Sequence, residues 1–208
     1  MTTFFVSVDL FDPAGPKRMK DGNVYGGETR LFVLADDTLD TALRTLINAV
    51  DAQGMRIDRL HKAAPTATFQ SDDFPFDVDV AAMSRDAREL DEICVTPDYT
   101  FSPYGNNETG LFYGLFDYFD PSRGTPYAGE FCHAARKADT CGDALRAVLD
   151  DLASDNCRLK AIEDFSDAHF YDPSVTLPAG SLGDLIASTP DGIIWAEGAT
   201  LYESEDDD

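Results

Sequence analysis

The pattern of apolar and polar residues predicts strands and helices in a fixed order. Residues 3–11 and 28–35 are rich in apolar, β-branched and aromatic side chains, and the first run ends at an Asp-Pro turn, which is typical of strands. Residues 38–53 predict a helix, because apolar side chains recur there at helical spacing: Leu39, Leu43, Leu46, Ile47 and Val50. Residues 55–60 then predict a third strand.

Most of these landmarks occur a second time in the second half of the chain. The repeated segments are VDLFDP at 8–13 with FDYFDP at 116–121, YGGE at 25–28 with YAGE at 127–130, and DTALR at 40–44 with GDALR at 142–146. We therefore interpret the chain as two copies of one unit, with the third strand of the second copy at 157–162.

The ends and exposed faces of the two helices can also be predicted. Asp36 or Asp37 is the expected N-terminal cap of the first helix. An arginine follows the first core leucine of each helix, and at spacings of three or four residues it is expected to pair with an acid of the same helix. These pairs are Arg44 with Asp40 and Arg146 with Asp143.

Beyond the third strands the two copies diverge. Residues 69–80 predict a strand in the first copy, because its apolar residues 74, 76, 78 and 80 share one parity. Short helices are expected at 81–91 and 182–188. Each copy is expected to end in a hairpin-like pair of short strands, at 93–95 with 100–101 and at 193–195 with 200–201.

These elements predict an α+β fold made of two tandem units of about 100 residues each. Each unit is β-β-α-β followed by a short helix and two short strands, with helices packed on mainly antiparallel sheets and a pseudo-twofold axis between the units. The predicted boundaries are 1–103 for the first unit, 104–110 for a Gly- and Asn-containing linker, 111–202 for the second unit and 203–208 for an acidic tail.

The strongly negative net charge limits the classes of molecule that the protein can be expected to bind. The net charge is −23, from 30 Asp and 9 Glu against 11 Arg and 5 Lys. Such a surface repels nucleic acid and anionic membranes and attracts cationic partners. The sequence has no run of 18 apolar residues to span a membrane, no signal peptide is recognised, and the four cysteines show no framework spacing, so a cytoplasmic location is expected.

Three acids of the first copy are weak candidates for a metal site. Asp9, Asp12 and Glu28 stand where the first strand ends and the second begins, and their counterparts recur in the second copy. If the two strands pair, these carboxylates converge at one edge and offer oxygen ligands to Ca²⁺ or Mg²⁺. The alternative is ordinary turn chemistry, since Asp before Pro favours a turn. No cofactor is expected.

Two groups of residues are candidates for partner binding. Asp72, Asp73, Phe76 and Asp77 form an acid-flanked apolar segment that either packs into the core or docks a partner. The other group is an aromatic and acidic rim that would receive an Arg or Lys of a partner, although the same residues also suit a packed strand edge. The members of this rim are Tyr25, Glu28, Tyr127 and Glu130.

No catalytic motif is recognised, and the three histidines are not shared between the copies, so the chain is expected not to be an enzyme. The leading hypothesis is an acidic binding protein that engages a basic protein, such as an immunity protein, an antitoxin or a mimic of nucleic-acid charge. The alternatives are a structural or housekeeping protein with a salt-adapted surface, and a metal-dependent hydrolase using Asp9, Asp12 and Glu28. The expected assembly is a monomer with an internal pseudo-dimer, or a homodimer.

Overall fold

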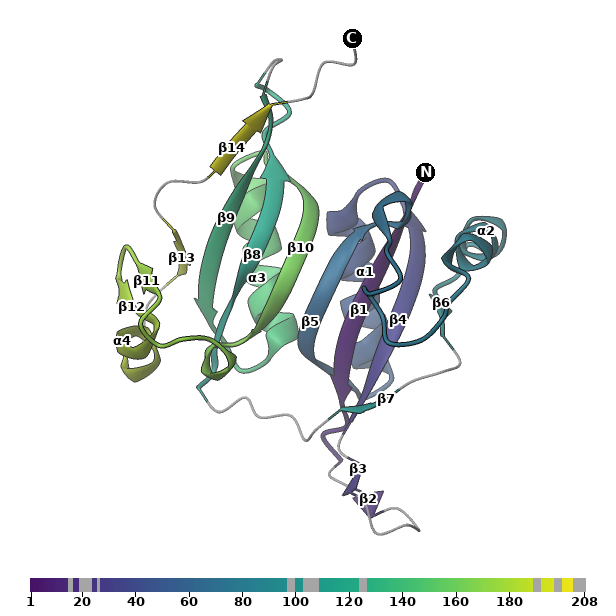
Figure 1. Ribbon diagram of the computed structural model, residues 1–208, viewed down its shortest axis with the longest axis horizontal. Helices are drawn as coiled ribbons and strands as arrows, with labels where there is room; N and C mark the ends of the chain where they lie inside the picture. The colour runs from purple at the N-terminus through teal and green to yellow at the C-terminus, as the bar shows by residue number, and fades with distance from the viewer. Residues whose placement is uncertain are drawn as a thin grey trace.

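The computed structural model describes residues 1–14, 17–18, 24–25, 27–96, 100–102, 109–123, 127–188, 192–196 and 200–203. Within these residues the chain is a mixed α+β protein with one large antiparallel sheet and four α-helices (Figure 1). The helices are α1 (Leu39–Ala52), α2 (Val80–Leu90), α3 (Cys141–Ser154) and α4 (Leu182–Ala187).

The large sheet contains ten of the described strands. They are β1 (Thr2–Phe11), β4 (Gly27–Asp36), β5 (Arg56–Pro65), β6 (Cys94–Val95), β7 (Thr100–Ser102), β8 (Leu111–Phe119), β9 (Tyr127–Lys137), β10 (Arg158–Asp167), β13 (Ile193–Trp195) and β14 (Thr200–Glu203). The order across the sheet is β13-β9-β8-β10-β5-β1-β4-β6, with β14 also on β9 and β7 also on β4. Two separate ribbons pair β2 (Lys17–Arg18) with β3 (Val24–Tyr25), and β11 (Thr176–Leu177) with β12 (Gly180–Ser181).

The centre of the sheet is the pairing of β5 with β10. These strands run antiparallel and are in register at Leu60 with Phe165, Lys62 with Glu163 and Ala63 with Ile162. On one side of this joint the order is β5-β1-β4, and on the other it is β10-β8-β9. The segments predicted as two units therefore share one continuous sheet.

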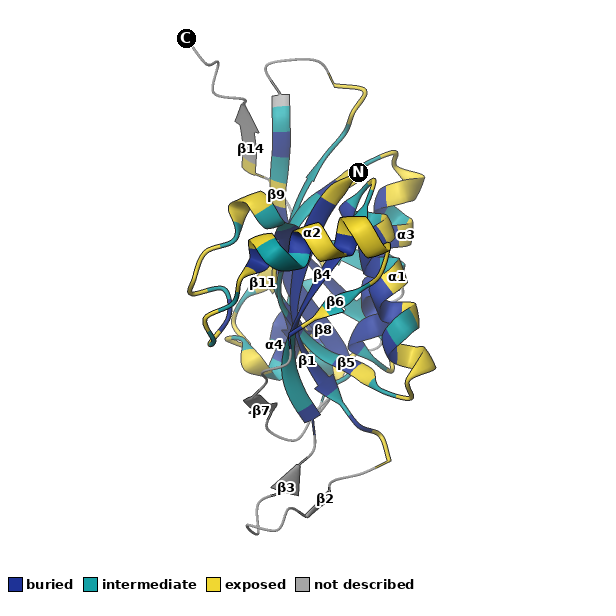
Figure 2. Ribbon diagram, turned by 90° about the vertical axis from the view of Figure 1, so that its right-hand side faces the viewer, coloured by how far each residue is buried: buried dark blue, intermediate teal, exposed yellow. Residues whose placement is uncertain are grey.

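The helices cover the two faces of the sheet differently (Figure 2). Helices α1 and α3 lie side by side on one face, called here the first face, and form the main core with residues of β1, β5, β8 and β10. In β5 and β10 these core residues stand three positions apart, because both strands have register irregularities. Helix α2 covers the opposite, second face over β1 and β4, and α4 covers it over β8 and β9. Side chains alternate between faces along a strand, so every long strand contributes to both layers.

Both long helices begin at a threonine cap. The Thr38 side chain accepts a hydrogen bond from the Thr41 backbone amide, and Thr140 accepts one from Asp143 in the same way. The prediction of Asp36 or Asp37 as the cap was wrong. Asp36 instead accepts a hydrogen bond from the Thr41 hydroxyl at 2.6 Å. It therefore supports the first turn through a side chain of that turn and not through a backbone amide.

The arginines of α1 and α3 connect the two helices. The predicted pair of Arg146 with Asp143 is confirmed at 3.2 Å, but Arg146 also bonds Asn48 and Asp51 of α1. Arg44 lies 2.7 Å from Asp150 of α3. The paired residues are more than 90 positions apart in the sequence, and Arg44 and Asp150 are 106 apart. No short sequence pattern indicates such distant contacts, so the sequence could not predict them.

Two predictions for the later part of each copy were wrong. Residues 69–79 form turns and irregular backbone rather than a strand, and the regular spacing of Phe74 and Phe76 instead brings their rings within 5.6 Å of each other under α2. The short strands do not pair as hairpins, because β6 and β7 both add to β4, and β13 and β14 both add to β9. A long edge strand offers more backbone partners than another short strand does.

Candidate partner-binding surface

Helix α2 is amphipathic and presents a charged face to solvent. Asp79 caps it by accepting a hydrogen bond from the Ala82 amide at 2.8 Å. Val80, Ser84 and Ala87 are buried against the sheet, which fixes the orientation of the helix. The helix ends at Asp91, whose φ of 55° is left-handed. Met83 also packs against this core, whereas Ala81, Arg85, Asp86, Arg88, Glu89 and Leu90 are exposed.

The outward positions and the flanking loops carry a dense group of carboxylates. Residues 72–92 contain eight acids and two arginines. Seven of these acids are exposed and make up what we call the acidic α2 surface: Asp72, Asp77, Asp79, Asp86, Glu89, Asp91 and Glu92. Apart from the cap formed by Asp79, no ion pair or hydrogen bond occupies these carboxylates within the described part of the chain. They are free to meet a cationic partner.

The first predicted group divides between this surface and the fold. Asp72 and Asp77 are exposed. Asp73 is nearly buried, lies 3.1 Å from Lys62 and accepts a hydrogen bond from the Gln70 amide, so it anchors the loop. Phe76 is half-buried against the core under α2. Apolar side chains that do reach solvent beside the acids are Leu90, 62% exposed, and Val95, 49% exposed, which sequence reasoning missed.

The second predicted group is not brought together. Glu28 on β4 and Glu130 on β9 are separated by the four strands β1, β5, β10 and β8. Each carboxylate is also engaged, Glu28 by Arg30 at 2.8 Å and Glu130 by Arg123 at 2.6 Å. Tyr25 and Tyr127 belong to strands, and their side chains lie outside the described residues.

The predicted convergence of Asp9, Asp12 and Glu28 was wrong. Asp9 lies opposite Thr29 and Glu28 lies opposite Leu10, so the two carboxylates point to opposite faces of the sheet. Asp12 accepts a hydrogen bond from the Ala14 amide at 2.9 Å, as expected of a turn. Among the described residues no group of three Asp, Glu, His or Cys side chains is arranged to hold a metal ion.

A polar cluster around β1, β5 and the end of β10 was not anticipated. His61 Nε2 lies 3.0 Å from Asp9 Oδ1, His169 Nδ1 lies 2.9 Å from Asp167 Oδ1, and Arg59 forms a bidentate pair with Asp164 at 2.9 and 2.8 Å. Burial raises the pKa of Asp9, but the contacts with His61 and Thr29 outweigh it and lower the net pKa. Each histidine is thus held by a carboxylate, an arrangement that ties β5, β1 and β10 together.

Asp58 lies near this cluster and differs from the other acids. Burial raises its pKa to about 6, and the negative charges of Asp9 and Asp167 add to the effect. A carboxyl group with such a pKa changes protonation near neutral pH. Nothing in the spacing of Asp58 in the sequence distinguishes it from the other 29 aspartates.

Comparisons with protein families, with curated proteins and with solved structures find no significant match to this chain. No helix in the described residues is long and apolar enough to cross a membrane. The class of protein must therefore be argued from the fold and from its exposed surfaces.

Proposed function

We propose that the chain is a non-enzymatic binding protein that captures a basic protein through the acidic α2 surface. The observation that carries this proposal is the uneven placement of the acids. Helices α2 and α4 cover corresponding ends of the same face of the sheet. Residues 168–188, which contain α4, carry two acids, Asp172 and Asp184, against eight acids and two arginines in residues 72–92. The Asp184 carboxylate is bonded to Ser181 in the cap of α4.

The asymmetry favours recognition over solubility alone. Acidic residues that served only solubility or salt adaptation would not need to be concentrated around one of two corresponding helices. The unoccupied carboxylates would steer a cationic partner and raise its association rate. Leu90 and Val95 would then supply an apolar contact within the acidic surroundings, which is the usual anatomy of an interface.

A basic nuclease covered by an immunity protein or antitoxin is the kind of partner that fits best, since such a partner carries its own cationic surface. Mimicry of nucleic-acid charge belongs to the same class. The four cysteines are free thiols, which supports a reducing compartment such as the cytoplasm.

Internal duplication is part of the same proposal. It is supported by the order β4-β1-β5 with crossover helix α1, which is matched by β9-β8-β10 with α3. It is also supported by reciprocal contacts between the helices. Arg44 contacts Asp150, which lies four positions after Arg146, and Arg146 contacts Asn48, which lies four positions after Arg44. A pseudo-twofold between β5 and β10 would explain both observations.

The test of the partner-binding function is capture from a lysate of the source cells with a charge-matched control. Asp86→Lys with Glu89→Lys reverses two charges on α2, and Asp155→Lys with Asp172→Lys reverses two exposed charges elsewhere. Wild type and the control should retain the same basic protein at low salt and release it at high salt, and the α2 variant should lose it.

Equal retention by both variants would refute the assignment of the surface. Capture of nothing at low salt, together with a melting temperature that rises strongly in molar KCl, would support the salt-adapted alternative instead.

A further inference from the structure

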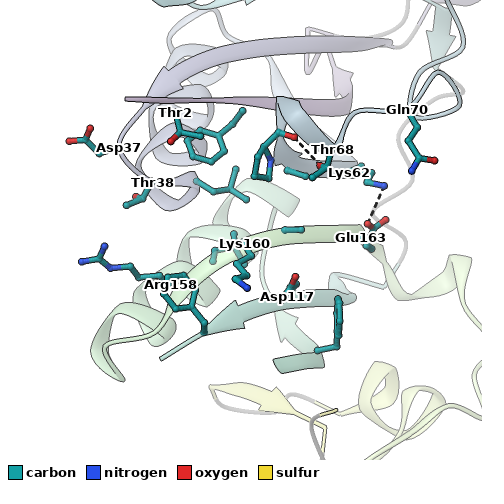
Figure 3. Close-up of a pocket in the computed structure, with 18 residues that line it drawn as sticks. Thr2, Asp37, Thr38, Lys62, Thr68, Gln70, Asp117, Arg158, Lys160 and Glu163 are labelled. Carbon is teal, nitrogen blue, oxygen red and sulfur yellow. Dashed lines mark hydrogen bonds and ion pairs between the residues drawn. The ribbon is translucent and has the colours of Figure 1, made fainter. Parts of the chain in front are cut away.

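A cavity of about 580 Å³ opens where β5 and β10 stop pairing (Figure 3). The two strands are in register over only three residue pairs, and beyond these they separate towards the N-terminus of α1. We call this cavity the interstrand pocket. Its lining includes Phe4, Leu39 and Leu159 of the main core, each at most 5% exposed, and Ala64 of the core under α2, which is 3% exposed.

The pocket is open at Ala161, a small residue where the other half of the sheet has a large one. Ala161 of β10 lies opposite Asp117 of β8, whereas Arg59 of β5 lies opposite Asp9 of β1. The Arg59 side chain fills its surroundings by pairing with Asp164 and lying 5.2 Å over the ring of Phe170. Ala161 stands at the position on β10 that corresponds to Arg59 on β5, and its methyl group is too small to fill the equivalent space.

The walls combine aromatic rings with positive charge. Phe119 and Phe131 line the pocket, and Phe131 is 38% exposed. Lys62, Arg158 and Lys160 also line it, which is unusual on a chain with a net charge of −23. The volume lies within the range of about 300–1,000 Å³ typical of small-molecule sites.

Of the three cations, Arg158 is the one available to a ligand. Lys62 is paired with Asp73 and Glu163. Lys160 donates a hydrogen bond to the Ala128 carbonyl at 2.6 Å. Arg158 makes no ion pair within the described residues. Burial raises the pKa of Asp40, and the charge of Arg158 is among the influences that oppose this rise. Figure 3 places Arg158 at the same end of the pocket as Thr38, the cap of α1, whose helix dipole adds positive potential.

We infer that the interstrand pocket binds a small organic monoanion with an apolar body. The apolar body would contact the buried apolar residues and the rings of Phe119 and Phe131, and the acidic group would pair with Arg158. An arginine fork suits a carboxylate or sulfonate. A polyanion is disfavoured because Asp37, Asp117 and Glu163 also line the pocket. This site does not depend on the proposed capture of a basic protein.

The test uses 8-anilinonaphthalene-1-sulfonate, an aromatic monoanion whose fluorescence rises on binding, beside the uncharged N-phenyl-1-naphthylamine. We expect one molecule of the anion per chain. Arg158→Gln should weaken its binding about tenfold, the value of one charge-assisted contact. Asp37→Asn should tighten it by removing a competing carboxylate. The uncharged probe should bind both variants as it binds wild type.

Arg56→Gln is the matched control, because Arg56 lies opposite Phe11 as Arg158 lies opposite Phe119. It should leave the affinity for both probes unchanged. Ala161→Phe should abolish binding of both probes by filling the pocket, with the melting curve as a check of folding.

An equal loss in the two arginine variants, or unchanged binding in Arg158→Gln, would overturn the inference. Arg158 and Asp37 are exposed, so their opposite effects decide the matter even if Ala161→Phe does not fold.

Discussion

At the scale of single residues, burial gives a few acids properties that their sequence neighbours lack. Asp58 has a folded pKa of about 6, mainly because burial disfavours its carboxylate, against 3.8 as its ordinary value. Between these two values the folded chain binds more protons than the unfolded chain. The stability that the protonated form contributes is therefore complete below about pH 4 and is lost as the pH rises through about 6.

Asp58→Asn should stabilise the protein near neutral pH, since the amide resembles the protonated acid. We expect the free energy of unfolding to rise by about 1–2 kcal/mol at neutral pH, after allowance for solvent screening. This gain should shrink as the pH is lowered from 7 to 5. Urea unfolding over that range measures it, with Asp77→Asn, an exposed aspartate, as the control. A gain that is independent of pH would contradict this account.

At the scale of elements, capping is a separable contribution to stability. Thr140 accepts the Asp143 amide at 3.0 Å and donates its hydroxyl to the Asp143 carboxylate at 2.7 Å at the start of α3. The first amides of a helix have no partner within the helix, so loss of this acceptor leaves one unsatisfied.

Thr140→Ala should therefore lower the free energy of unfolding by about 1 kcal/mol. Thr140→Ser keeps the hydroxyl and should retain most of that stability. Thermal or urea unfolding of the three proteins gives the comparison. A serine variant as unstable as the alanine variant would show that the methyl group, rather than the cap, matters at this position.

At the scale of the whole molecule, the joint between β5 and β10 determines what each half can do alone. Residues 1–103 contain β5 but lack β10, so their last long strand would expose its unpaired backbone groups. Another copy of the same segment offers an equivalent edge, and twofold pairing of two β5 strands would resemble the joint in the intact chain.

We expect the segment 1–103, expressed alone, to form a dimer. Its molar mass from light scattering after size exclusion should be twice that of one chain. A folded monomer of the segment would contradict the prediction and would indicate that the β5 edge is covered in another way.

The candidate surfaces show how far sequence reasoning reached. It named Asp72 and Asp77, because a run of acids beside phenylalanines is visible in the chain, and both residues are exposed. It could not separate Asp73, which differs only in its contact with Lys62. It also missed the interstrand pocket, whose lining residues range from Thr2 to Glu163 and have no common local pattern.

The sequence by itself determined where the long strands, the two long helices and the short helices begin, because apolar periodicity and turn residues act within a few positions of each other. It predicted β5 and β10 only at 55–60 and 157–162, whereas they extend to Pro65 and Asp167. The tertiary structure alone decided the pairing of β5 with β10, the contacts of Arg44 and Arg146, the separation of Asp9 from Glu28 on opposite faces, and the raised pKa of Asp58. All of these depend on which distant segments become neighbours. That is decided by the burial of whole faces rather than by any local pattern.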